Sequence, residues 1–508
     1  MFAKVNSFGL LGLDGLNIDV EVDTNIGLPS YDIVGLPDAA VKESKERVRS
    51  AIKNSGFKFP TNRITVNLAP ANVKKAGANF DLPIAVAILV SSNQIQGSKY
   101  QDFVIIGELS LNGKIKPVNG ILPLLISAKS KGFNNFIIPK ANAAESSFIE
   151  GINVYALDSL VDVVSFLTGV CGFEKQEQSV WNNESYEDIT EDFARVKGQK
   201  IAKRVMEIAV AGGHNILMIG PPGSGKTMIA RCVPSIMPKL TFEEALEVTK
   251  VHSIAGELDQ ASGIIKSRPF RTPHHTASTV SLVGGGRDAK PGEVSLASNG
   301  VLFLDELPEY SRTTLETLRQ PLEDGVITVS RASGSFEYPA NFMLVASMNP
   351  CPCGNYGSKT STCTCSAAQI QSYLKRLSGP LLDRIDLKID VDRVDFLDLS
   401  SKSLEESSVE IRKRVEQARD IQTKRFEGTS IHTNAKMNSK MVNEFCKLNE
   451  PCEVLVKLAF EKYKMSARGY TRILKVARTI ADLDGSEKIK ENHIAEALAY
   501  RNVDKFGL

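Results

Sequence analysis

The stretch GPPGSGKT, from Gly220 to Thr227, constrains the fold of this chain more than any other part of its sequence. It matches G-x-x-x-x-G-K-[ST], follows the apolar run NILMI and precedes TMIARCV, which has the pattern of a helix. Such a loop surrounds phosphate oxygens with backbone N–H groups, and it needs a strand before it and a helix after it. The motif therefore predicts an α/β domain with a nucleoside-triphosphate site, and a chance glycine-rich turn is the alternative.

The residues of this loop have distinct expected roles. Lys226 offers positive charge to the β- and γ-phosphates of ATP, and the Thr227 hydroxyl ligates Mg²⁺ at the positive end of the following helix. The glycines allow the backbone to bend round the phosphates. The expected ATP-binding residues are Gly220, Pro221, Pro222, Gly223, Ser224, Gly225, Lys226 and Thr227.

Carboxylates are also expected at the end of a neighbouring strand, because a magnesium triphosphate needs them. In GVLFLDE, Val301–Leu304 reads as a buried strand, Asp305 as a Mg²⁺ ligand beside Thr227, and Glu306 as the base that orients the attacking water. Apolar runs that end in two acidic residues are common. Together with the phosphate loop, however, this run predicts that ATP is hydrolysed as well as bound.

Two further residues complete the expected catalytic set. The run NFMLVASMN ends at Asn349, whose amide would sense the γ-phosphate, and a buried capping asparagine is the alternative. Arg384 precedes another apolar strand, where an arginine of one ring subunit can stabilise transition-state charge at its neighbour's nucleotide. The alternative for Arg384 is a local ion pair with Asp383 or Asp386.

Length and charge limit the other possibilities. A chain of 508 residues favours two to four domains. With 61 basic and 59 acidic residues, its formal net charge is +2, so contacts with nucleic acid must come from local patches. The sequence contains no apolar run of about 18 residues and has acidic residues where a signal peptide would be apolar. We therefore expect a cytoplasmic protein that has no membrane partner.

The pattern along the chain predicts four segments. Residues 1–170 alternate short β-branched runs with turns and one or two helices, as in a compact α+β domain, and the polar, acidic stretch 171–192 reads as a linker. Residues 193–397 alternate strands and helices, as a parallel sheet requires, with an insertion near 250–298. Residues 398–508 have helical spacing throughout.

Four cysteines form the pattern C-x-C-x9-C-x-C. In a reducing compartment this crowding favours a metal over disulfides, and four thiolates are a ligand set for structural Zn²⁺. The spacing differs from the usual C-x2-C knuckle, so free thiols or a redox-active pair remain the alternative. The expected zinc ligands are Cys351, Cys353, Cys363 and Cys365.

The run KSRPFRTPHHTAS lies between the two nucleotide motifs. Its prolines favour a loop, and a basic, partly aromatic loop could hold a phosphate backbone. Packing at a subunit interface is the alternative. Three consecutive glycines follow, which suit a mobile hairpin tip. The residues of the cluster are Lys266, Arg268, Phe270, Arg271, His274 and His275.

Several motifs resemble one known family over nearly the whole chain. They are GLPDAAVKESKERVRSAI, AGGHNILMIGPPGSGKTMIA, RPFRTPHHTAS, PGEVSLASNGVLFLDELPEY, NPCPCG, GPLLDRIDL and SARGYTRILKVARTIADL. They resemble the ComM/YifB family of magnesium-chelatase-like AAA+ ATPases. The resemblance implies a P-loop AAA+ core with a helical lid of the magnesium-chelatase C-terminal type.

The resemblance also implies a function. Family members are expected to form hexameric rings that hydrolyse ATP and drive branch migration of DNA during natural transformation, with branched or single-stranded DNA as partner. Carried over by motif, Asn349 is sensor 1, Arg384 the arginine finger and Arg468 sensor 2, with Arg472 as the rival for the last role.

The first segment resembles the fold of Lon-type proteases, which is related to ribosomal S5 domain 2. Where such a protease has its nucleophilic serine, KKAGANFDLP places Asn79, and where it has its lysine, KPVNGILPLL places Leu122. We therefore expect no proteolysis, and a scaffold or DNA-guiding role instead.

Two functions of other classes stay open. One is a motor that drives magnesium insertion into a porphyrin, although chelatase motors resemble this chain from the phosphate loop onward and lack its first 170 residues. The other is a nucleotide-switched scaffold, which would not need Glu306 and Arg384 for turnover.

Overall fold

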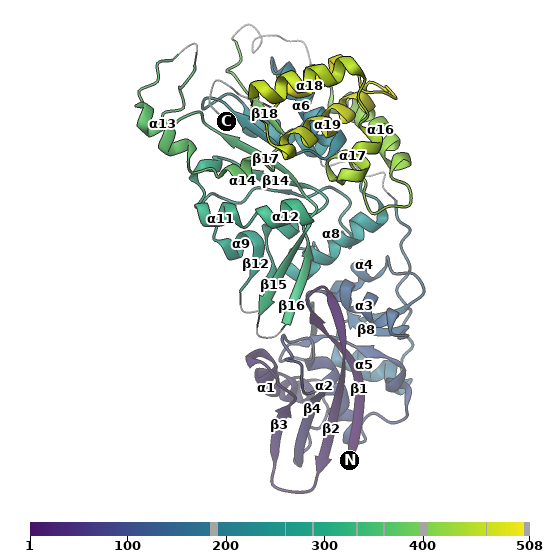
Figure 1. Cartoon of the computed structure of the whole chain (residues 1–508). Helices are drawn as coiled ribbons and strands as arrows, with labels where there is room; N and C mark the ends of the chain where they lie inside the picture. Colours follow the sequence, from purple (N-terminus) through teal and green to yellow (C-terminus); the bar gives the residue numbers. More distant parts are fainter. Residues whose placement is uncertain are drawn as a thin grey trace.

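The computed structural model shows two bodies stacked end to end, with the N-terminal domain at one end and the phosphate-loop domain with the C-terminal helices at the other (Figure 1). The fold class expected from the sequence is confirmed in its main features, a mixed α/β protein with a parallel sheet and a helical C-terminal region. The structure describes residues 1–182, 191–259, 261–286, 289–331, 334–358, 361–395, 405–463 and 465–501.

The N-terminal domain is built on a seven-stranded mixed sheet with the order β3-β4-β2-β1-β5-β8-β9. The long β1–β2 hairpin is antiparallel, and the remaining pairs are parallel except β2–β4. The strands are β1 (Phe2–Leu11), β2 (Asp14–Asn25), β3 (Ser30–Val34), β4 (Arg63–Ala69), β5 (Val104–Ile105), β8 (Asn135–Pro139) and β9 (Asn153–Leu157).

Helices cover this sheet. One of them, α2, is buried along its whole length, because its residues are almost all apolar and it contacts β1, β2 and α1. The short hairpin of β6 (Glu108–Leu109) and β7 (Ile115–Lys116) lies beside α2. The helices are α1 (Ala39–Asn54), α2 (Asp81–Ser91), α3 (Ile121–Ser130), α4 (Ala143–Ser146) and α5 (Leu160–Thr168).

The phosphate-loop domain contains a five-stranded, wholly parallel sheet with the order β11-β14-β17-β10-β18. The carboxyl ends of parallel strands meet at one edge of a sheet. The turns that follow β10, β14 and β17 therefore lie together. The strands are β10 (Ile216–Ile219), β11 (Phe270–Arg271), β14 (Val301–Leu304), β17 (Met343–Met348) and β18 (Leu387–Asp390).

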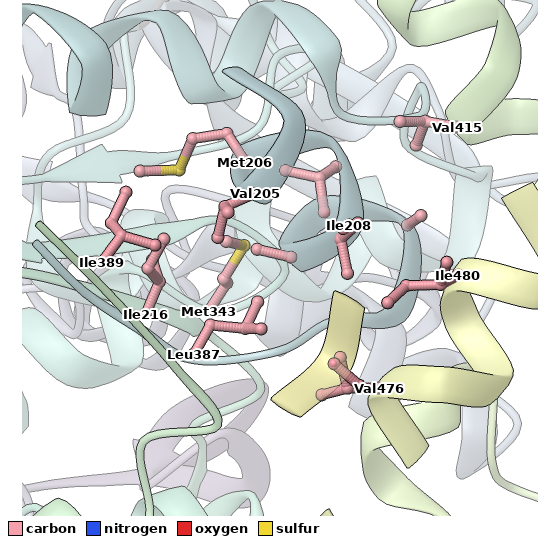
Figure 2. Packing of buried hydrophobic residues seen from close by; sticks show 14 of the residues in the cluster. Val205, Met206, Ile208, Ile216, Met343, Leu387, Ile389, Val415, Val476 and Ile480 are labelled. Atoms are coloured by element: carbon pink, nitrogen blue, oxygen red, sulfur yellow. The ribbon is translucent and has the colours of Figure 1, made fainter. Parts of the chain in front are cut away.

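One hydrophobic core joins this sheet to the C-terminal helices. In Figure 2, Val205 and Ile208 of α6 (Lys200–Gly212) lie between the sheet residues Ile216 and Leu387 and the lid residue Ile480. The lid thus shares its packing with the nucleotide domain. Its helices are α16 (Ser408–Arg425), α17 (Ser439–Phe445), α18 (Glu450–Tyr463), α19 (Ala467–Leu483) and α20 (Glu491–Ala499).

The stretch between the two nucleotide motifs differs from a simple insertion. It begins with the long helix α8, and β11 belongs to the central sheet, so the basic run starts inside the core.

An exposed hairpin, β15 (Val326–Arg331) with β16 (Gly334–Pro339), extends toward the N-terminal domain (Figure 1). The other elements are α7 (Lys226–Ile236), α8 (Phe242–Ala255), α9 (Thr279–Val283), β12 (Gly284–Gly285), β13 (Lys290–Pro291), α10 (Glu293–Leu296), α11 (Arg312–Glu316), α12 (Arg319–Asp324), α13 (Ala367–Leu374) and α14 (Gly379–Leu382).

The glycine-rich tip expected after the basic run is only partly visible. Gly284 and Gly285 pair with β13, and residues 287–288 lie outside the described residues. Within the described part of the chain, no helix is long and apolar enough to cross a membrane.

The two bodies meet where α3 and α4 contact α8. The Gly120 N–H donates to the Ser253 carbonyl at 3.1 Å, and the Ser253 hydroxyl donates to Glu145 at 2.8 Å. Asn142 and the backbone of Leu122 also donate to the Glu145 carboxylate. Burial raises the pKa of Glu145, and these hydrogen bonds oppose that effect. A buried, hydrogen-bonded carboxylate therefore joins the domains.

Candidate nucleotide-binding site

The phosphate loop connects β10 to α7, as its sequence requires. Gly223 and Gly225 have φ values of +76° and +89°, which L side chains rarely adopt. A Cβ on Gly220 would lie 2.1 Å from the Val391 carbonyl oxygen, so this position also needs glycine. The loop borders a cavity of about 400 Å³ that is lined by residues Pro222, Gly223, Ser224, Gly225, Lys226, Thr227, Met228, Asp305, Glu306, Ser347, Met348 and Asn349.

Lys226 lies at the centre of this loop. Its ammonium donates to the carbonyls of Gly220 and Pro221 at 2.7 and 2.9 Å and lies 3.4 Å from the Asn349 side-chain oxygen. Burial lowers the pKa of Lys226 to about 8, while the nearby carboxylates act in the opposite direction. A buried cation beside an amide and main-chain carbonyls can move to a phosphate at little cost in solvation.

The expected Mg²⁺ ligands lie side by side. The Thr227 hydroxyl donates to Asp305 Oδ2 at 3.0 Å, and the second oxygen of Asp305 accepts from the Ser347 hydroxyl and from the Glu306 backbone N–H. Hydroxyl and carboxylate oxygens are the donor set that Mg²⁺ prefers, so these residues fit the ion. Ser347 was not identified from the sequence, where it stands inside an apolar run.

Glu306 has an unusual backbone. Its φ of +52° is in the left-handed region, and its carboxylate is 53% exposed at the cavity. His275 approaches it, with 3.8 Å between Nδ1 and the carboxylate oxygen. The His275 ring also packs on Tyr310, whose hydroxyl donates to the Pro273 carbonyl at 2.6 Å. The end of the basic run therefore lies against the expected catalytic base, a contact that the sequence did not indicate.

Asn349 directly follows β17, at the edge of the sheet where a sensor is expected. Its side chain lines the cavity, and its backbone hydrogen-bonds the Tyr373 hydroxyl of α13. Because the amide is within reach of Lys226, it can also reach the phosphate that Lys226 would bind.

Arg384 and Arg468 lie together, outside the residues described as lining the phosphate-loop cavity. Both approach Glu323, and the Arg384 guanidinium also donates to the carbonyls of Arg319 and Pro380. Asp383 and Asp386, which the sequence offered as local partners of Arg384, are therefore not the main ones. Arg384 borders a separate cavity of about 480 Å³.

Arg472, the rival of Arg468, has a different environment. Its Nε lies 3.3 Å from Asp386, which also hydrogen-bonds His214. Burial would raise the pKa of Asp386, but His214, Arg472 and Arg501 together lower it to about 2. Arg472 therefore belongs to an internal ion-pair network, whereas 65% of the Arg468 side chain is exposed.

Two arginines of the basic run are less available to contact a phosphate backbone than the sequence suggests. Arg268 pairs with Glu244, and Arg271 is held between Glu257 and Glu293. Both guanidinium groups are neutralised within the chain, which favours the structural alternative for these two residues. His274 is exposed and stacks on the ring of its neighbour, with 4.1 Å between ring centroids.

The four clustered cysteines come together. Their sulfur atoms all lie within 4.8 Å of one another, so the cluster could hold a metal ion.

In the N-terminal domain, the residues at the protease positions serve the fold. The Asn79 amide donates to the Phe8 carbonyl at 3.0 Å, and Leu122, on α3, is buried in the core. Neither side chain is a nucleophile or a base.

Comparison with known proteins gives family matches along the chain. The model described as "Magnesium chelatase, subunit ChlI" matches residues 192–399, "Subunit ChlI of Mg-chelatase" matches residues 20–142, and "Magnesium chelatase, subunit ChlI C-terminal" matches residues 405–501. Because the second match lies in the N-terminal domain, that domain does not by itself argue against a chelatase-like function.

Full-length relatives are also found. The chain is 44% identical to Competence protein ComM of Haemophilus influenzae over 98% of this chain and 97% of that protein. It is 42% identical to the uncharacterized protein YifB of Escherichia coli over 99% and 97%. Lon protease 2 of Bacillus subtilis is 29% identical over 24% of this chain and 22% of that protein, in agreement with the expected Lon-like domain.

Proposed function

Because this chain belongs to the ComM/YifB family of magnesium-chelatase-like AAA+ proteins, we propose that it is an ATP-driven ring motor that acts on DNA. Its proposed task is branch migration of recombination intermediates during natural transformation, in the cytoplasm. One observation carries the motor assignment: Lys226, Thr227, Asp305, Glu306 and Asn349 line one cavity at the edge of a parallel sheet. The family supports ATPase activity, and the name of the ComM relative supports a role in competence.

The proposed chemistry follows from these positions. Lys226 would move from its loop carbonyls to the β- and γ-phosphates, and Thr227 and Asp305 would hold Mg²⁺. When bound, the ion neutralises charge that develops on the phosphate oxygens. Glu306 would accept a proton from the attacking water, and Asn349 would position the γ-phosphate.

The proposed ring accounts for Arg384 and Arg468. Neither residue is among the described residues that line the chain's own cavity, so both would act on the nucleotide of a neighbouring copy in a homo-oligomer, proposed as a hexamer. An arginine supplied across an interface stabilises charge in the transition state of phosphoryl transfer. Glu323 holds both arginines and would release Arg384 to the neighbour's phosphates on assembly.

The proposed organisation keeps four segments. Residues 1–170 form a catalytically inactive Lon-like domain, 171–192 a linker, 193–397 the ATPase core and 398–508 the lid. Branched or single-stranded DNA is the proposed partner. His274 is exposed, and its neighbour His275 approaches Glu306. This pair is the proposed link between DNA binding and ATP hydrolysis.

We also propose structural zinc at the cysteine cluster. Tetrahedral Zn²⁺ binds four thiolates at about 2.3 Å, and the four sulfur atoms are close enough to one another to serve one ion.

The test is the ATPase rate of the purified protein without DNA and with single strands, duplex or a four-way junction. We expect the junction to stimulate the rate and its labelled arms to move. Glu306→Gln should lower turnover on the order of 10²-fold or more while retaining ATP. Glu427→Gln, a change of the same kind at an exposed position, should leave turnover unchanged.

A chelatase-like motor is the second candidate, favoured by the three family models named for ChlI. It predicts an ATPase rate that is indifferent to every DNA. Normal turnover by Glu306→Gln would contradict both motors and favour a nucleotide-switched scaffold.

A further inference from the structure

The cysteine cluster has the dimensions of an occupied metal site. The sulfur of Cys351 lies 3.4 Å from that of Cys353 and 3.7 Å from that of Cys363, and the latter two are 3.6 Å apart. Four ligands at about 2.3 Å from a tetrahedral ion are about 3.8 Å from one another. The backbone therefore already brings the sulfur atoms close to the corners that Zn²⁺ requires.

Main-chain donors support the sulfur atoms of the first pair. The Tyr356 N–H donates to Cys351 at 3.3 Å, and the backbones of Asn355 and Thr364 hydrogen-bond Cys353. Hydrogen bonds from such N–H groups orient the ligand atoms of a metal site.

The first pair is attached to the nucleotide site. Cys351 follows Asn349 by two residues, and Gly354 packs on the phosphate loop so closely that a Cβ there would lie 2.5 Å from Pro222 Cδ. One short turn thus carries the polar sensor at its start and contacts the phosphate loop at its end.

The second pair is attached to α13. Cys365 immediately precedes Ser366, which caps this helix. Tyr373 of α13 reaches the backbone of Asn349. Arg376, two residues beyond the end of α13, donates to the Pro308 carbonyl at 3.2 Å and to Glu309 at 2.9 Å, just after the expected catalytic carboxylates. A metal that joins both pairs would therefore join the end of β17, the phosphate loop and α13 into one rigid wall of the cavity.

We propose that the four thiolates hold a zinc ion whose role is to position the nucleotide site: it fixes the turn at Gly354 against Pro222 and thereby the phosphate loop and Asn349. The proposal rests on the nucleotide and zinc sites proposed above. Loss of the ion lets this turn move, so a smaller fraction of the protein has a loop ready for phosphate. If that fraction falls to about one tenth, the apparent Kd rises about tenfold.

The experiment measures zinc content and nucleotide affinity on the full-length protein. Elemental analysis of protein from zinc-supplemented medium should find about one zinc per chain. Cys363→Ser with Cys365→Ser should lose the zinc and bind a fluorescent ADP about tenfold more weakly. Cys171→Ser, which removes an exposed cysteine outside the cluster, should keep both properties.

A second variant separates the metal from its effect. Gly354→Ala leaves all four thiols in place but pushes the turn away from Pro222, so it should keep the zinc and still bind ADP more weakly. Wild-type protein without zinc, or zinc-free protein with unchanged ADP affinity and normal secondary structure, would overturn the proposal. Full ADP binding by Lys226→Ala would instead contradict the nucleotide site itself.

Discussion

Lys226 makes the affinity for nucleotide depend on pH. Burial lowers its pKa to about 8, so half of the free protein has lost this charge at that pH, whereas phosphate binding requires it. Binding must then take up a proton. The apparent affinity should be nearly constant below about pH 7, be halved near pH 8 and fall by up to about tenfold per pH unit above that.

Fluorescent ADP titrations between pH 7 and 9.5 check this expectation. Lys226→Arg stays charged over the whole range and should give a flat, though weaker, profile. A flat profile for the wild-type protein would contradict the role given to the buried ammonium.

Arg384 is expected to affect turnover without affecting binding. Because its guanidinium lies with Glu323, outside the described lining of the phosphate-loop cavity, Arg384→Ala should leave ADP affinity within about twofold and lower ATPase turnover by about 10³-fold. The assays are ADP titration and steady-state turnover at a protein concentration high enough for the proposed ring to assemble. Weaker ADP binding by dilute Arg384→Ala would place this residue at the chain's own nucleotide instead.

At the residue level, sequence motifs predicted a set of nucleotide-site residues that the structure brings together in one cavity. Lys226, Thr227, Asp305 and Asn349 follow strands of one parallel sheet, so their spacing in the chain already implied a common edge. The contact between His275 and Glu306 could not be predicted in this way. It depends on how a long segment folds back over the cavity, and no local pattern encodes that path.

The lid helix α19 is a larger element whose packing can be tested directly. Ile480 of α19 is fully buried in the core that α19 shares with α6, so Ile480→Ala should lower the free energy of unfolding by roughly 2–5 kcal/mol. Urea denaturation followed by circular dichroism measures the change. Leu458→Ala on α18, at a side chain that is 59% exposed, is the matched control and should have little effect. Equal losses in both variants would mean that α19 does not share the core.

Helices whose apolar residues recur every three or four positions were predictable from the sequence, and elements without such a pattern were not. The apolar spacing of α16 and α19 indicated helices because each buries one face. β11 has only two residues, and its pairing with β14 is what makes it a strand. The hairpin of β15 and β16 was not identified, although Phe336 on it packs on Gly12 of the N-terminal domain.

At the scale of the whole molecule, the junction between the two bodies depends on Glu145. Glu145→Ala would leave the donors on Ser253, Asn142 and Leu122 without their acceptor, so we expect weaker docking of α3 and α4 on α8. Hydrogen exchange at Ser253 and along α8 should become faster, while the phosphate loop still binds ADP. Glu150→Ala, at an exposed position nearby, is the control. Unchanged exchange in α8 would show that the carboxylate does not hold the domains together.

The raised pKa of Glu145 adds a pH dependence to this junction. A carboxyl whose pKa is higher in the folded than in the unfolded protein favours folding when protonated, so docking should weaken as the pH rises above about 4.5 and this carboxyl ionises. The slower exchange of α8 at low pH, after correction for the intrinsic rate, should therefore be lost in Glu145→Ala.

The packing of Trp181 has an optical consequence. It is the only tryptophan of the chain, and its ring lies 5.7 Å from that of Phe242, where α8 begins shortly after the phosphate-loop helix α7. Indole emission shifts to longer wavelength when water reaches the ring. The unmodified protein thus contains its own fluorophore beside α8, and its emission spectrum would report in real time whether nucleotide or DNA loosens the contact between Trp181 and α8.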